Sequence, residues 1–140
     1  MSDATPPIVQ RGGCHCRAIR FEADGALEGL EICNCSICLM HGTVHWYVPK
    51  ERFRLLCEDP PLATYRFGTG RARNHFCSVC GVVPFRIARS DPEKIDVNVR
   101  CLDGMTLERL QVLDTTRFDG EHWEDAYRAQ RPERSDGDAP

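Results

Sequence analysis

Cysteine spacing is the feature that most constrains how this chain of 140 residues can fold. Seven of its nine cysteines form two groups, which are Cys14, Cys16, Cys77 and Cys80, and separately Cys33, Cys35 and Cys38. Four thiolates complete a tetrahedral zinc site, whereas three leave a position that water or a substrate can occupy. The spacing therefore predicts two zinc ions per chain, one in a closed site and one in an open site. Because thiolates oxidise readily, an isolated sample can lack the second ion.

The composition favours metal-bound thiols over disulfides. A reducing cytosol keeps thiols free, and the chain opens with no basic and apolar leader, so we expect a cytoplasmic protein. The hydrophobic fraction of 41% suits a globular fold, and the apolar runs are too short to cross a bilayer. A formal charge of -3 argues against nucleic acid as a partner, because such binding depends on neutralising phosphates.

The chain organisation indicates one domain with two loose ends. Residues 1–7 contain two prolines and no periodicity, and residues 131–140 are charged and small, so both segments are predicted to be flexible tails. Residues 8–130 are predicted to form a single zinc-binding β domain, since their segments are short, rich in β-branched and aromatic residues, and separated by turns.

The expected fold class is therefore mainly β, with little helix. Predicted strands cover residues 8–12, 18–23, 30–32, 44–48, 53–56, 64–67, 74–76, 82–87 and 95–98. Pro84 predicts an edge position for its strand, because proline cannot donate a hydrogen bond to a neighbouring strand. One short helical stretch is expected over residues 36–41, and no long amphipathic helix is predicted.

The closed group has the spacing of a structural site. Cys14 and Cys16 are two apart, so in a strand both side chains reach the same face. Cys77 and Cys80, followed by Gly81, match a zinc knuckle, in which a tight turn directs backbone N–H groups at the sulfurs. A redox C-x-x-C pair and two disulfides are the alternative interpretations.

The open group can form a tripod of sulfurs. Cys33 and Cys35 share a strand face, and the following turn can bring Cys38 round to them. A fourth protein ligand would instead make the site structural. The candidates for that ligand are Cys57, Cys101, His41 and His45.

Several separated motifs together resemble one protein family. They are Gly13-Cys14-His15-Cys16 with Ala18-Ile19-Arg20-Phe21, Cys33 to Cys38, Thr64 to Thr69, His75 to Gly81, Asp96 to Asp103, and Phe118-Asp119-Gly120 with Trp123-Glu124. In this order they resemble the glutathione-dependent formaldehyde-activating enzyme family, which also includes centromere protein V. The resemblance implies several short coiled, mostly antiparallel β-sheets organised around a structural zinc. It assigns that zinc to Cys14, Cys16, Cys77 and Cys80, and a catalytic zinc to Cys33, Cys35 and Cys38.

The resemblance also implies a reaction class and a partner. It predicts a carbon-sulfur lyase type activity on a small thiol or thiol adduct, with glutathione and formaldehyde as the family's pair. The alternative is a non-catalytic, zinc-stabilised module that binds another protein. For a thiol that carries carboxylates, the candidate cations are Arg71, Arg73 and Arg100. His41 and His45 are candidates for moving a proton, and Cys57 and Cys101 are expected to be small apolar residues.

Overall fold

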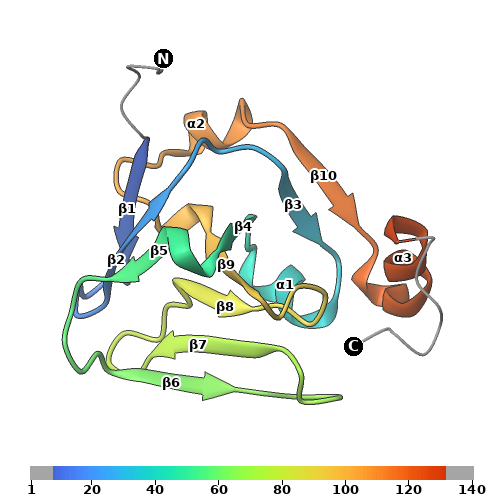
Figure 1. Cartoon of the computed structure of the whole chain (residues 1–140), viewed down its shortest axis with the longest axis horizontal. Helices are drawn as coiled ribbons and strands as arrows, with labels where there is room; N and C mark the ends of the chain where they lie inside the picture. The colour runs from blue at the N-terminus through green and yellow to red at the C-terminus, as the bar shows by residue number, and fades with distance from the viewer. Residues whose placement is uncertain (1–7, 132–140) are drawn as a thin grey trace.

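The computed structural model describes residues 8–131, so the tail predicted over residues 1–7 and nearly all of the tail predicted over 131–140 lie outside the described residues. The mainly β class is confirmed (Figure 1). The strands are β1 Val9–Gly13, β2 Arg20–Asp24, β3 Leu30–Cys33, β4 His45–Pro49, β5 Phe53–Leu55, β6 Leu62–Tyr65, β7 Arg73–Cys77, β8 Phe85–Ile87, β9 Lys94–Asn98 and β10 Thr115–Phe118. The helices are α1 Ser36–His41, α2 Leu107–Gln111 and α3 Trp123–Gln130, with 3-10 turns η1 Lys50–Arg52, η2 Val99–Cys101 and η3 Gly120–His122.

The strands form two sheets. One sheet has the order β1-β2-β5, and the other has seven strands in the order β10-β3-β4-β9-β8-β7-β6. Figure 1 shows the larger sheet running from β10 and β3 at the upper right to β7 and β6 at the bottom. Every pairing is antiparallel except that of β10 with β3, which is parallel. The larger sheet therefore brings β10 beside the segment that leads into Cys33.

Aromatic rings join the two sheets in the core. Phe21 of β2 stacks on Phe53 of β5 with ring centroids 5.3 Å apart, and Phe85 of β8 meets both rings, at 6.3 Å from Phe21 and 5.0 Å from Phe53. Phe21 is completely buried. Full burial of such a side chain contributes about 1.5–3 kcal/mol to folding, so this aromatic cluster stabilises the contact between the sheets.

Three details of the sequence prediction are corrected by the topology. The strand that follows Pro84 is not at an edge, because β8 lies between β9 and β7. Pro84 precedes the strand, and its carbonyl accepts a hydrogen bond of 3.0 Å from the Asn98 N–H. The pairing of β8 with its neighbours therefore does not depend on a donor from the proline. Strand β10 was not predicted, and α2 and α3 are two helical segments beyond the expected short one. Among residues 8–131, no helix has the length and apolar character needed to span a membrane.

Candidate metal centres

The closed group is assembled from two distant parts of the chain. Cys14 and Cys16 follow β1, whereas Cys77 ends β7 and Cys80 lies in the turn before β8. Their four sulfurs all lie within 4.8 Å of one another, and the Cys16 sulfur is 3.6 Å from both the Cys14 and the Cys77 sulfur. Zinc–sulfur bonds of about 2.3 Å place tetrahedral sulfurs roughly 3.8 Å apart. The spacing fits a metal ion, and it is too long for a disulfide bond of about 2.05 Å.

Backbone N–H groups point at these sulfurs. The Ile19 N–H lies 3.3 Å from the Cys14 sulfur, and the N–H groups of Val79 and Cys80 lie 3.3 and 3.4 Å from the Cys77 sulfur. The N–H of Val82 lowers the pKa of the Cys80 thiol to about 6. Such bonds favour thiolates, which are the form that binds metal. All nine cysteines are free, so this group is able to hold a metal.

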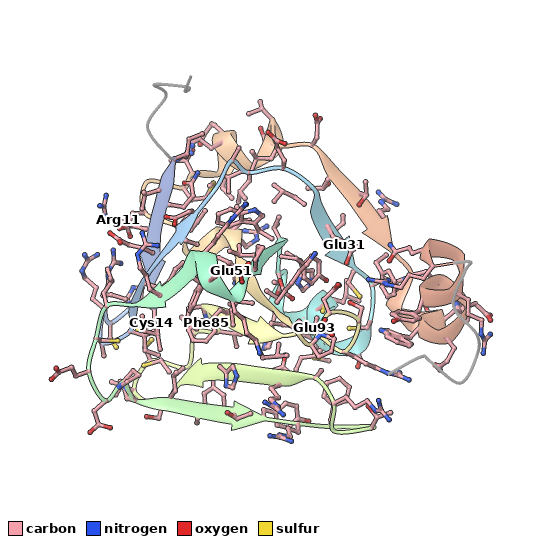
Figure 2. All side chains as sticks on the ribbon, in the orientation of Figure 1. Arg11, Cys14, Glu31, Glu51, Phe85 and Glu93 are labelled. Carbon is pink, nitrogen blue, oxygen red and sulfur yellow. The ribbon has the colours of Figure 1, made fainter. Side chains whose placement is uncertain are left out.

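The open group is compact as predicted. Cys33 ends β3, Cys35 precedes α1, and Cys38 is buried within α1, so a strand, a turn and a helical turn bring three sulfurs within 4.8 Å of one another. The Cys35 N–H lies 3.4 Å from the Cys33 sulfur. In the view of Figure 2, Cys14 lies at the left, whereas Glu31, two residues before Cys33, lies at the right. The two groups are therefore separate sites.

None of the predicted fourth ligands joins the open group. Within residues 8–131, no histidine, aspartate, glutamate or further cysteine places a ligand atom within 4.8 Å of all three sulfurs. Cys57 points at the Arg20 carbonyl, and Cys101 points at the Val83 carbonyl. Burial raises the pKa of the Cys101 thiol to about 12, which keeps that thiol protonated. His45 is buried elsewhere, with its Nδ1 atom 2.7 Å from Asp96.

A pocket of about 220 Å³ opens beside the open group. The side chains of Cys33, Cys35 and Cys38 form part of its wall. The rest of the wall is mostly apolar and aromatic, with a few polar groups: Ile37, Phe67, Ala72, Ala88, Phe118 and Trp123, together with Glu31, Tyr47, Thr69, Arg86, Arg89 and Ser90. Mostly apolar walls with a few convergent polar groups are typical of small-molecule sites.

Glu31 and Tyr47 supply a polar pair in this wall. The Tyr47 hydroxyl donates a hydrogen bond of 2.9 Å to Glu31 Oε1. Burial raises the pKa of the Glu31 carboxyl, although the bond from Tyr47 acts in the opposite direction. Sequence reasoning missed Glu31 as a site residue, because one acidic residue in a short strand gives no signal that it faces a pocket.

Residues 119–121, which follow β10, cover one side of the open group. The side chain of Asn34 holds this segment, since its Nδ2 donates to Asp119 Oδ1 at 2.9 Å and its Oδ1 accepts from the Glu121 N–H at 3.0 Å. Gly120 packs directly against the Cys33 and Cys35 side chains. Residues 119–121 therefore help to build the site.

The structure replaces the predicted cations of the pocket with different arginines. Arg71, Arg73 and Arg100 are exposed and do not line the pocket, and Arg100 Nε donates instead to the Gly42 carbonyl at 2.8 Å. Arg86 and Arg89 line the pocket in their place. The Arg89 guanidinium lies 3.6 Å above the Trp123 ring, which holds it at the wall.

Comparison with known proteins places these features in a family. Residues 9–117 match the family described as glutathione-dependent formaldehyde-activating enzyme. The fold is also similar to the crystal structure of a Rhodobacter sphaeroides protein solved as a Northeast Structural Genomics target. That comparison has a TM-score of 0.68 and 30% sequence identity, and it covers 76% of this chain and 99% of the other. The chain belongs to the glutathione-dependent formaldehyde-activating enzyme family.

Proposed function

We propose that this protein is a zinc-dependent carbon-sulfur lyase that makes or breaks the bond between a small thiol and a carbonyl carbon. The observation that carries the proposal is the open group itself: three sulfurs, with no fourth ligand among residues 8–131, forming part of a pocket wall. The family suggests glutathione and formaldehyde as the reacting pair. The free thiols also favour the cytoplasm as the proposed location.

The reaction needs no oxidant or reductant. In the forming direction, the thiol sulfur adds to the carbonyl carbon, and the thiol proton ends on the carbonyl oxygen as a hydroxyl. The reverse direction breaks the carbon-sulfur bond and restores the thiol and the carbonyl. A zinc ion held by Cys33, Cys35 and Cys38 would supply a Lewis acid that stabilises the thiolate form of the substrate at neutral pH.

The pocket residues orient the substrate beside the three sulfurs. The rings of Phe67, Phe118 and Trp123 exclude water from part of the wall. Arg89, held by Trp123 and lying 3.8 Å from Glu124, presents a guanidinium that suits a substrate carboxylate. The hydrogen-bonded Glu31 and Tyr47 give the carbonyl oxygen polar neighbours in an otherwise apolar wall.

Substitution of one open-group ligand tests the proposal. We expect Cys35→Ser to stay folded and to bind one zinc per chain instead of two. Its activity should fall at least about 100-fold, because the proposed reaction depends on the zinc of the open group. The measurements are zinc content and the rate of adduct formation from formaldehyde with glutathione and other small thiols. Cys57→Ser, which removes a thiol outside both groups, is the matched control and should behave like the wild type. Full activity in a folded, one-zinc Cys35→Ser variant would refute the proposal.

A protein-interaction module is the second candidate function. The observation that favours it is an apolar surface between α1 and β6, where Met40, Tyr65 and Phe67 line one groove and are 88%, 51% and 40% exposed. Exposed apolar groups of this kind often mark contact sites. X-ray absorption of the zinc-loaded protein separates the two functions. A thiol that perturbs one zinc site favours the enzyme, whereas two sites inert to every thiol favour the module.

A further inference from the structure

A row of polar side chains crosses the larger sheet beside the pocket. The strand register places Asn74 of β7 opposite Arg86 of β8, and Arg86 opposite Asp96 of β9. Tyr47 of β4 lies opposite Asp96 on its other side. Directly opposed residues share one face of a sheet. Because Arg86 and Tyr47 line the pocket, the row lies on the pocket face.

Arg86 is the centre of this row. Its Nη1 donates to the Cys38 sulfur at 3.3 Å, and its Nε lies 3.1 Å from Asp96 Oδ2. The same oxygen of Asp96 lies 2.7 Å from His45 Nδ1. The side chains of Arg86, Asp96 and His45 are only 11%, 0% and 1% exposed, so water cannot replace these contacts.

Stability alone does not account for this arrangement. A buried ion pair is often no more stabilising than apolar side chains of similar volume, because its charges must first be removed from water. In addition, three buried atoms of this group, Arg86 Nε, Asp96 Oδ1 and His45 Nε2, have no hydrogen-bond partner in the part of the chain that the structure describes, so Arg86 Nε and Asp96 form an ion pair without hydrogen-bond geometry. Unpartnered buried polar atoms are costly and call for an explanation. The contact of Arg86 with the Cys38 sulfur indicates a role for this costly group at the open site.

The two cysteine groups also differ in what donates to their sulfurs. In the closed group, the donors to Cys14 and Cys77 are backbone N–H groups. Cys38 receives its bond from a guanidinium, which always carries a positive charge. Three thiolates around a divalent ion would leave one net negative charge, and the Arg86 cation, shared between Asp96 and the Cys38 sulfur, lies next to that charge.

We propose that Arg86 is a positioning residue of the open site, which fixes the Cys38 sulfur and compensates its charge, and that Asp96, oriented by His45, holds the guanidinium in place. This inference rests on the proposed function for its second zinc, but it concerns metal binding and not the substrate. It assigns the buried Arg86, Asp96 and His45 contacts to the site. It also predicts that loss of the guanidinium affects one zinc and leaves the other unchanged.

Arg86→Met tests the assignment in the zinc-loaded protein. We expect the open site to bind zinc about 10- to 100-fold more weakly, as is typical when a group that supports a metal ligand is removed. Competition with a chelator measures the zinc affinity of each site. The Cys35→Ser variant, which lacks the open-site zinc, identifies which of the two zinc-release steps belongs to the open site. In the Co²⁺-substituted protein, the sulfur-to-cobalt absorption of the open site should shift while that of the closed site stays unchanged.

Two further variants separate positioning from folding. Arg73→Gln removes an exposed arginine from the neighbouring strand β7 and should leave both affinities unchanged. Arg86→Met leaves Asp96 buried without its cation, and the variant can fail to fold for that reason. In that case the double variant Arg86→Met with Asp96→Asn removes both charges, and its zinc affinities and cobalt spectrum are measured in the same way.

Each outcome is decisive. A selective loss at the open site in the single or double variant supports the inference. Wild-type zinc affinities and cobalt spectra in a folded variant, or an equal loss at both sites, would overturn it and leave the proposed enzyme standing. A wild-type chain that binds only one zinc would overturn both proposals.

Discussion

Gly120 controls how closely the 119–121 segment approaches the open group. A methyl group on its Cα would overlap the Cys33 sulfur and lie 2.9 Å from the Cys35 Cβ. Overpacking of this kind costs roughly 1–3 kcal/mol. We therefore expect Gly120→Ala to push the 119–121 segment away, lower the thermal midpoint and weaken zinc at the open site. Gly29→Ala, which strains a positive φ of 67° where nothing lies within 4 Å, should lower stability but leave both zinc affinities intact.

Individual residues differ in how far their roles follow from sequence. The seven clustered cysteines were predicted to form two groups, and the structure brings the sulfurs within each group close together, because spacing of two and three residues largely fixes local sulfur geometry. Arg86 and Asp96 could not be predicted in this way. Each stands between apolar neighbours in a short strand, a pattern that usually marks a solvent-facing side chain, and only the pairing of distant strands shows that they are buried.

Helix α3 forms part of the pocket wall through the ring of Trp123. Trp123 stacks on Tyr127 with centroids 4.7 Å apart and meets Phe118 at 6.4 Å. Since Trp123 is only partly buried, we expect Trp123→Ala to cost about 2 kcal/mol, less than the roughly 3–5 kcal/mol of a fully buried tryptophan. With glutathione as the proposed thiol substrate, the variant should bind it at least several-fold more weakly while keeping both proposed zinc ions, as measured by calorimetry and metal content. Leu107→Ala on exposed α2 is the control. Unchanged glutathione binding would remove α3 from the substrate site.

Strand β10 and helix α3 show how far local sequence patterns can predict the elements of this fold. The nine predicted strands all overlap observed ones, because alternating β-branched and aromatic segments are a local signal. Strand β10 is exposed along Thr115, Thr116 and Arg117, so it lacks that alternation and exists through its parallel pairing with β3. Eight-residue α3 likewise depends on the contacts of its aromatic rings with the rest of the fold, since isolated helices of that length are marginal.

At the scale of the whole molecule, the two cysteine groups occupy different structural positions. The closed group joins the loop after β1, in the smaller sheet, to the end of β7, in the larger one. The open group links only residues at the end of β3 and the start of α1, which are already close in sequence. A metal in the closed group therefore stabilises contact between sheets, whereas one in the open group constrains a local loop.

This difference predicts unequal costs of metal loss. Cys80→Ser should lower stability by several kcal/mol, because zinc binding at a site that exists only in the folded chain contributes directly to folding, whereas Cys35→Ser should change the thermal midpoint by only a few degrees. Thermal unfolding followed by circular dichroism, with and without a strong chelator, measures both effects. A reductant added without chelator should leave the wild-type midpoint unchanged, since all nine cysteines are free. If reductant destabilised the protein and chelator did not, disulfides in place of metal would hold Cys14, Cys16, Cys77 and Cys80.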